Sequence, residues 1–183
     1  MNSANLVTCI RVLLVPLVVI IYYSPLAWGN LLAAALFGIA SITDWLDGYL
    51  ARRLNQTSDF GAFLDPVADK LLVVVAMVFL TAAYPSPWFV LPAAIIIARE
   101  VFVSALREWM ASKNQRDAVA VGYVGKLKTT SQMVAILILI AAMPGWPDWF
   151  WQTGYALIYL SAVLSLWSMV GYLRKALPAL DLK

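Results

Sequence analysis

The sequence predicts an all-α integral membrane protein, a bundle of six transmembrane helices with both termini in the cytoplasm. Three observations lead to this prediction: the composition, the lengths of the apolar segments, and the uneven charge of their connections. The chain has 183 residues, of which 63% are hydrophobic and only 13% are charged, and its mean hydropathy is +0.82. Soluble domains carry about 25% charged residues. We therefore expect residues 1–183 to form a single membrane domain.

Six apolar segments follow one another, each near the ~20 residues that a helix needs to cross a bilayer. The expected spans are Leu6–Tyr23, Asn30–Leu50, Phe60–Tyr84, Trp88–Met110, Ala120–Met143 and Trp149–Leu173. Proline and glycine mark three of the breaks, at Ser24-Pro25, Pro85-Ser86-Pro87 and Pro144-Gly145-Trp146-Pro147.

The other connections are polar. The segment Arg52–Asp59 is expected to be a short turn between the second and third spans. Lys113 and Arg116 follow the fourth span and are expected to face anionic lipid. The first apolar run is followed by bulky residues and Pro25, so we expect no cleavable signal peptide there.

Charge orients the bundle. The three connections with proline contain no Lys or Arg, and all the basic residues lie toward the opposite side. The positive-inside rule makes that opposite side cytoplasmic, and six spans then bring both termini to it. Aromatic residues gather at the outer boundary, as in an aromatic belt. These are Tyr22, Tyr23, Trp28, Tyr84, Trp88, Trp146, Trp149 and Trp151.

Four carboxylates lie near the cytoplasmic ends of the second and third spans. Asp44 and Asp47 are three residues apart, and Asp65 and Asp69 are four apart, so each pair shares one helical face. An antiparallel helix pair brings the two faces together. Four anions at close range repel each other, and divalent cations remove that conflict. An all-oxygen donor set favours Mg²⁺, Mn²⁺ or Ca²⁺.

Two other interpretations of these carboxylates remain open. In the first their role is structural, with Asp44 paired to Arg52 or Lys70. In the second the protein is a cation transporter or channel. A transport pathway needs polar groups through the full depth of the membrane, whereas the charges here cluster at one face.

Residues Asp44 to Asp69 resemble the signature of the CDP-alcohol phosphotransferases. The sequence has D-x2-D-G-x2-A-R-x8-G-x3-D-x3-D, with all eight fixed positions present over 26 residues. The Asn5-x-x-Thr8-x-x-Arg11 start is also similar to the family. A closer likeness, to bacterial members that use sn-glycerol 3-phosphate, lies in Phe63–Lys70, Ala98–Glu100, Ser104–Trp109 and Gly125–Thr129.

The resemblance implies transfer of a phosphatidyl group from CDP-diacylglycerol to an alcohol, with release of CMP. It implies that Asp44, Asp47, Asp65 and Asp69 hold two metal ions, Mg²⁺ or Mn²⁺, and that Asp69 is also the general base. It further implies an active site facing the cytoplasm at the bacterial inner membrane, in contact with membrane lipids, and a homodimer.

The resemblance also suggests which residues bind the CDP-lipid. Those at matching positions are Asn5, Thr8, Gly48, Arg52 and Ser58. Gly48 and Gly61 lack side chains, so a nucleotide can approach the helix backbone closely there. Arg52 can donate bidentate hydrogen bonds to a diphosphate.

An acceptor such as sn-glycerol 3-phosphate needs cations for its phosphate, and Arg99, Arg107, Lys126 and Lys128 are the candidates. Glu100 is a poor expected partner for Arg99, because successive residues point about 100° apart on a helix. Lys126 and Lys128 have an alternative role as snorkelling residues that orient the span. Other acceptors, namely inositol phosphate, serine or phosphatidylglycerol, also remain open.

Other partners and chemistries are disfavoured. The basic residues follow the membrane topology, so the pI of about 9.1 does not indicate nucleic acid. Histidine is absent, which excludes histidine-based acid–base catalysis. Cys9 is the only cysteine, which excludes an internal disulfide.

Overall fold

The computed structural model describes residues 3–54, 59–113 and 123–177, and in them the chain is helical throughout apart from its short connections. The helices are α1 (Ser3–Tyr22), α2 (Gly29–Leu54), α3 (Asp59–Ala83), α4 (Pro87–Ser112), α5 (Tyr123–Ala141) and α6 (Asp148–Ala176). The all-helical prediction is confirmed for these residues, and each helix coincides with an expected span to within a few residues.

One predicted boundary is wrong. The segment Arg52–Asp59 was expected to be the turn between two spans, but α2 continues through Arg52 to Leu54 and α3 begins at Asp59. Alanine, arginine and leucine are strong helix formers, so the sequence Ala51 to Leu54 continues the helix past the last apolar position.

Proline and glycine lie at the breaks between helices where the sequence predicted them. Pro87 is the first residue of α4, where its missing N–H leaves no helical hydrogen bond unmade. Gly145 adopts a positive φ of 87° in the connection between α5 and α6. This left-handed conformation is open to glycine at little cost and allows the tight reversal before Pro147.

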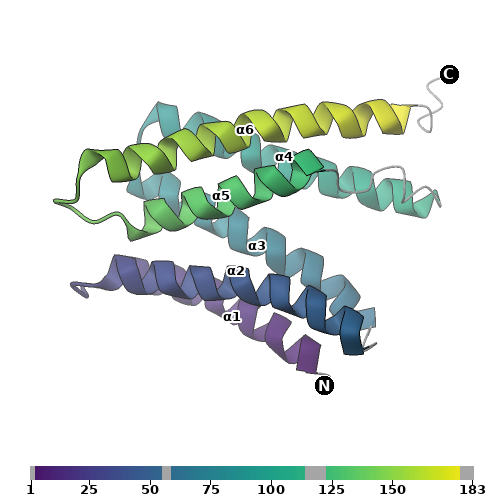
Figure 1. Ribbon diagram of the computed structural model, residues 1–183, viewed down its shortest axis with the longest axis horizontal. Coiled ribbons are helices and arrows are strands. Elements are labelled where there is room, and N and C mark those ends of the chain that lie inside the picture. The colour runs from purple at the N-terminus through teal and green to yellow at the C-terminus, as the bar shows by residue number, and fades with distance from the viewer. Residues whose placement is uncertain (1–2, 55–58, 114–122, 178–183) are drawn as a thin grey trace.

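The helices form two antiparallel pairs around α3 (Figure 1). α1 packs along α2, and α5 packs along α6, while α3 contacts both pairs and α4 lies against α6. The start of α1 and the end of α6 lie toward the same end of the molecule, together with the end of α2 and the start of α3. The carboxylate-rich segment therefore belongs to the end of the molecule at which α1 begins and α6 ends.

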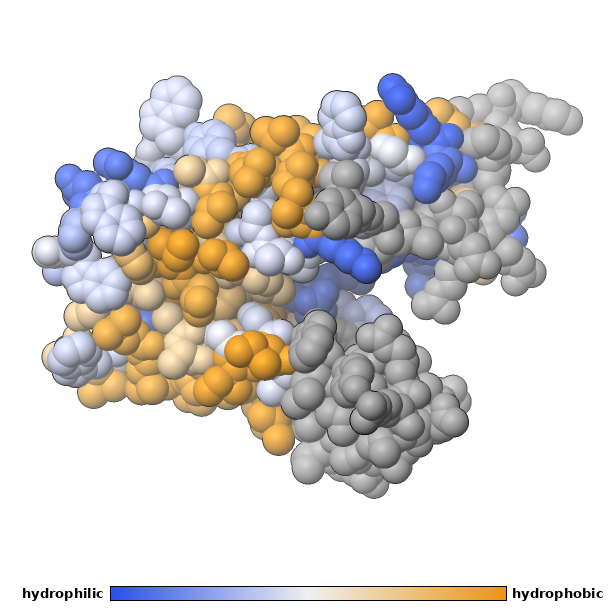
Figure 2. All heavy atoms as spheres, viewed as in Figure 1, coloured by the Kyte–Doolittle hydropathy of each residue, from blue (hydrophilic) through white to orange (hydrophobic). Residues whose placement is uncertain are grey.

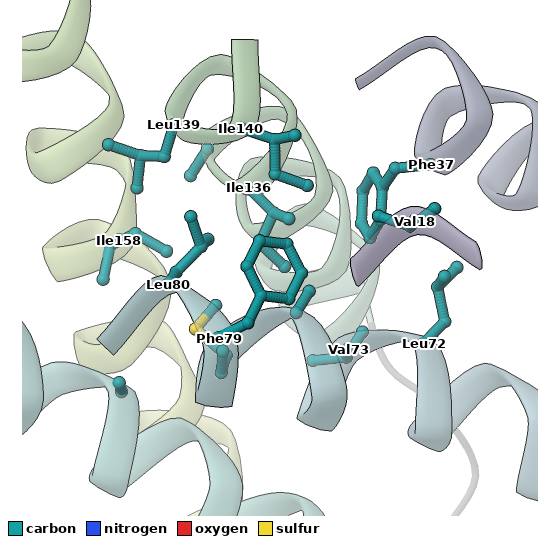
Figure 3. Close-up of a cluster of buried hydrophobic side chains, with 14 of the residues drawn as sticks. Val18, Phe37, Leu72, Val73, Phe79, Leu80, Ile136, Leu139, Ile140 and Ile158 are labelled. Atoms are coloured by element: carbon teal, nitrogen blue, oxygen red, sulfur yellow. The ribbon is translucent and has the colours of Figure 1, made fainter. Parts of the chain in front are cut away.

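A continuous apolar core holds the pairs together (Figure 3). It contains residues from all six helices, including Val18, Phe37, Leu80, Phe89, Ile136 and Ile158. A smaller apolar cluster of Val103, Met110, Tyr172 and Ala176 joins α4 to α6.

The outer surface is apolar over much of the visible face (Figure 2). Among the described residues, three helical segments are long and apolar enough to cross a membrane: Pro66–Ala83, Pro87–Ser112 and Asp148–Ala176. Thr8–Tyr22 and Gly29–Thr43 are shorter apolar stretches. The composition and these helices are those of a membrane protein, whereas the count of six spans stays a prediction.

Candidate active site

A polar cavity of about 670 Å³ lies among α3, α4, α5 and α6. Seven charged residues line it: Asp69, Lys70, Arg99, Glu100, Arg107, Glu108 and Lys128. Figure 2 shows hydrophilic side chains gathered at a hollow in an otherwise largely apolar face. So many charges around one cavity of a membrane protein indicate a functional site rather than packing.

Helical spacing brings these residues to the cavity. On α4, Arg99, Val103 and Arg107 recur every four residues and line the same wall. On α5, Gly125, Lys128 and Gln132 are spaced by three and four residues and likewise line one wall. On α3, Asp69 stands one turn before Val73, so the carboxylate lies where the apolar stripe of this helix ends.

Glu100 joins two of the cations, which corrects the expectation that it is a poor partner for Arg99. Its Oε1 accepts a hydrogen bond from Arg99 Nη1 at 3.1 Å and another from Lys128 Nζ. The directions of neighbouring Cβ atoms do diverge on a helix, but a guanidinium at the end of a long side chain can bend back across that angle. The angle between the two Cβ directions therefore does not prevent contact between the ends of the Arg99 and Glu100 side chains.

Arg99 is fixed from two further directions. Its Nη2 donates to Ser168 Oγ on α6 at 3.1 Å, and its Cζ lies 6.0 Å from the centre of the Tyr172 ring. Arg107 approaches the same ring, with 5.7 Å between Cζ and the ring centre. Tyr172 thus contacts both arginines of α4 by cation–π interaction.

Lys70 follows the last aspartate of the signature and points to α4. Its Nζ donates to Ser104 Oγ at 2.5 Å. The sequence suggested Lys70 as a partner of Asp44, whereas the contact with Ser104 emerges only from the structure. Lys70, Glu100, Ser168 and Tyr172 are contacts that sequence reasoning missed. Glu100 and Lys70 carried a signal, since an ionisable residue within a span is functional by default.

The predicted acceptor residues divide into two groups. Arg99, Arg107 and Lys128 all line the cavity together with Asp69. Lys126 is exposed and is not among the lining residues. Two residues apart on a helix means about 200° apart around its axis, so only one of the two lysines can face the cavity.

Part of the predicted CDP-lipid site faces the interior. Thr8 and Gly61 are buried, and Thr8 is only 1% exposed. Arg11, one turn further along α1 and expected near the cytoplasmic side, is equally buried at 1%. The polar face of α1 therefore points into the bundle.

The remaining predicted residues fall outside the described part of the structure. Ser58 lies outside the described residues. Asn5, Asp44, Asp47, Gly48, Arg52 and Asp65 lie on described helices, but their side chains are outside the described set. Among the side chains that are described, no group of three acidic, histidine or cysteine residues is placed to hold a metal ion.

The donor chemistry nevertheless fits hard divalent cations. Asp69 is at the polar cavity, Asp65 is one turn earlier on α3, and α2, which carries Asp44 and Asp47, contacts α3. All four are carboxylates, and Mg²⁺ and Mn²⁺ prefer oxygen ligands. The residues present are therefore suited to such ions.

Comparison with known proteins decides the family. Residues 1–167 match the family described as CDP-alcohol phosphatidyltransferase. The chain belongs to the CDP-alcohol phosphatidyltransferase family. A relative from Salmonella choleraesuis is 53% identical over 96% of this chain and 94% of its own length. Relatives from Escherichia coli K12 and Shigella flexneri are 51% identical over the same shares. All three are named CDP-diacylglycerol–glycerol-3-phosphate 3-phosphatidyltransferase.

Proposed function

We propose that this CDP-alcohol phosphatidyltransferase transfers a phosphatidyl group from CDP-diacylglycerol to sn-glycerol 3-phosphate, releasing CMP and phosphatidylglycerol phosphate. The names of the near full-length relatives support both substrates. The observation that carries the proposal is the cavity itself, in which Asp69 lines the same space as three cationic side chains. A carboxylate beside an anion site suits deprotonation of an acceptor that carries its own phosphate.

Each group has a task in this proposal. Arg99, Arg107 and Lys128 bind the acceptor's phosphate through charge-assisted hydrogen bonds. Asp69 takes the proton from the attacking hydroxyl, working by position at the end of the cavity. The CDP-lipid head is held by Asn5, Thr8, Gly48, Arg52, Ser58 and Gly61. Lys126 serves as a charge at the membrane surface, because it points away from the cavity.

The metal requirement is part of the proposal. Asp44, Asp47, Asp65 and Asp69 would hold two Mg²⁺ or Mn²⁺ ions. When bound, such ions neutralise charge on the diphosphate and its leaving CMP. The chain's own residues then orient the acceptor from the other side, with its phosphate on α4 and α5 and its hydroxyl toward α3.

The proposed setting is the bacterial inner membrane. Six spans with both termini in the cytoplasm put the cavity at the cytoplasmic face. The shared end of the start of α1 and the end of α6 supports this topology (Figure 1). One domain of residues 1–183, assembled as a homodimer among membrane lipids, completes the proposal.

An acceptor panel tests the function. Purified protein is incubated with CDP-diacylglycerol, Mg²⁺ and one of four acceptors: sn-glycerol 3-phosphate, inositol phosphate, serine or phosphatidylglycerol. We expect CMP release to be fastest with sn-glycerol 3-phosphate and to stop on chelation of the metal. An equal rate with serine, which carries no phosphate, would reject the phosphate site. Metal flux through liposomes without any CMP release would instead favour a transporter.

A further inference from the structure

Glu100 joins two helices at the wall of the cavity. Its Oε1 is shared by Arg99 Nη1 from α4, at 3.1 Å, and by Lys128 Nζ from α5. The two cationic side chains are 9% and 3% exposed, and that of Glu100 is 18% exposed. All three groups are thus largely withdrawn from water, where charges interact more strongly.

Two cationic side chains that are largely buried do not lie side by side without an anion between them. Like charges withdrawn from water repel, and each long side chain can swing away to relieve the repulsion. One carboxylate between them replaces that repulsion with two attractive contacts. Among the described residues, Glu100 alone forms a hydrogen bond with Lys128 Nζ, and the Asp69 carboxylate attracts this ammonium less strongly, so the position of Lys128 depends mainly on Glu100.

Hydrogen-bond donors remain for a ligand. A guanidinium has five N–H donors and an ammonium has three. Arg99 uses one toward Glu100 and one toward Ser168, and its Nε is buried without a hydrogen-bond partner among the described residues. Lys128 uses one toward Glu100. The pair thus retains unused donors beside a cavity that Asp69 also lines.

We propose that Glu100 is a positioning residue that holds Arg99 and Lys128 side by side as a preformed site for the acceptor's phosphate. The inference rests on the proposed function. Glu100 does not touch the acceptor in this role. It removes the repulsion between the two cations before the phosphate arrives, so less of the binding energy is spent on gathering them.

The test is steady-state kinetics of Glu100→Gln, which keeps the size of the side chain and removes its charge. We expect the KM for sn-glycerol 3-phosphate to rise at least tenfold, while kcat and the KM for CDP-diacylglycerol stay within twofold. A lower or unchanged KM for the acceptor would overturn the proposal, because it would mean that Glu100 repels the phosphate or is idle. The proposal would also be overturned if kcat fell and both KM values rose by similar factors, because that result would indicate a merely structural role.

Two further variants sharpen the test. Glu108→Gln removes the same charge from another carboxylate at the cavity, which forms no ion pair with a described residue, and should change the acceptor KM by less than twofold. Glu100→Asp keeps the charge with a shorter reach and should give an intermediate KM. If Glu108→Gln matches Glu100→Gln, the effect is one of overall charge and the positioning role is wrong.

A double-mutant cycle links Glu100 to Lys128. In a Lys128→Met background, the repulsion is gone, so adding Glu100→Gln should raise the acceptor KM by less than threefold. The proposal would be contradicted if Glu100→Gln raised the acceptor KM by the same factor in the Lys128→Met background as in the wild-type protein. Failure of the wild-type protein to release CMP with sn-glycerol 3-phosphate would instead refute the proposed function. This outcome is distinguishable from a failure of the Glu100 role, which only the variants can show.

Discussion

Burial determines which partners the charged residues of this cavity need. Arg99 and Lys128 are 8% and 3% exposed, and a cation removed from water is costly unless it is paired. The Glu100 carboxylate and the Ser168 hydroxyl offset that cost through hydrogen bonds. The Tyr172 ring adds a cation–π contact to Arg99 and a second one to Arg107. The cations are therefore held by the protein and do not depend on a bound anion for their arrangement.

Asp69 is the residue whose substitution should affect chemistry most directly. We expect Asp69→Asn to lower turnover by at least about a hundredfold, because an amide cannot accept the acceptor's proton. Metal affinity should fall only in part, since three carboxylates remain. CMP release measures the first effect and calorimetric Mg²⁺ titration the second.

Asp44→Ala is the matched comparison for Asp69→Asn. It should weaken Mg²⁺ binding more, because it removes a whole carboxylate and leaves no oxygen in its place. Near-normal turnover in Asp69→Asn would show that another group takes the proton.

At the scale of elements, the close packing of α5 on α6 depends on a residue without a side chain. Gly154 is buried on α6, and a Cβ there would lie 2.7 Å from Leu139 Cγ and Cδ2. Leu139 is itself fully buried in the main core, so it has little room to move. Small residues at such contacts allow transmembrane helices to approach closely.

Gly154→Ala should therefore destabilise the protein. Overpacking costs about 1–3 kcal/mol, against a gain of roughly 0.5–1 kcal/mol from replacing a helical glycine. We expect a net loss of about 1 kcal/mol, seen as a lower Tm in detergent. Gly171→Ala on the same helix is the control, because no atom lies within 4 Å of the added Cβ. The prediction fails if both variants change Tm alike.

At the scale of the whole molecule, the arrangement of the helices and the distribution of charge both support the proposed membrane topology. The connection between α1 and α2 lies at the end opposite the start of α1 (Figure 1). Trp28 in that connection is 69% exposed, and Lys113 just after α4 is exposed as well. With six spans, the two positions lie on opposite sides of the membrane.

Cysteine labelling in intact cells checks this topology. In a Cys9→Ser background, we expect Trp28→Cys to react with a membrane-impermeant maleimide added outside. Lys113→Cys should react only after the membrane is opened. The cysteine-free parent controls for labelling of other groups. Labelling of Lys113→Cys from outside would invert the proposed orientation and move the cavity to the wrong face.

The sequence by itself determined the helical segments, their breaks and the family. The lengths of apolar runs and the proline or glycine breaks are local properties, so they can be identified without knowing which helices pack against each other. The signature from Asp44 to Asp69 likewise lies in one short stretch. Locality also explains the error at Arg52, because hydropathy marks the apolar part of α2 and says nothing of where the helix continues beyond it.

Only the tertiary structure decided which charges meet. It separated Lys128 from Lys126, joined Glu100 to two cations, and turned Tyr172 from α6 toward both arginines of α4. These contacts depend on the rotation of each helix about its axis and on the reach of long side chains between helices. Neither quantity is set by spacing along one helix, so the partners of a buried charge emerge only when the helices pack.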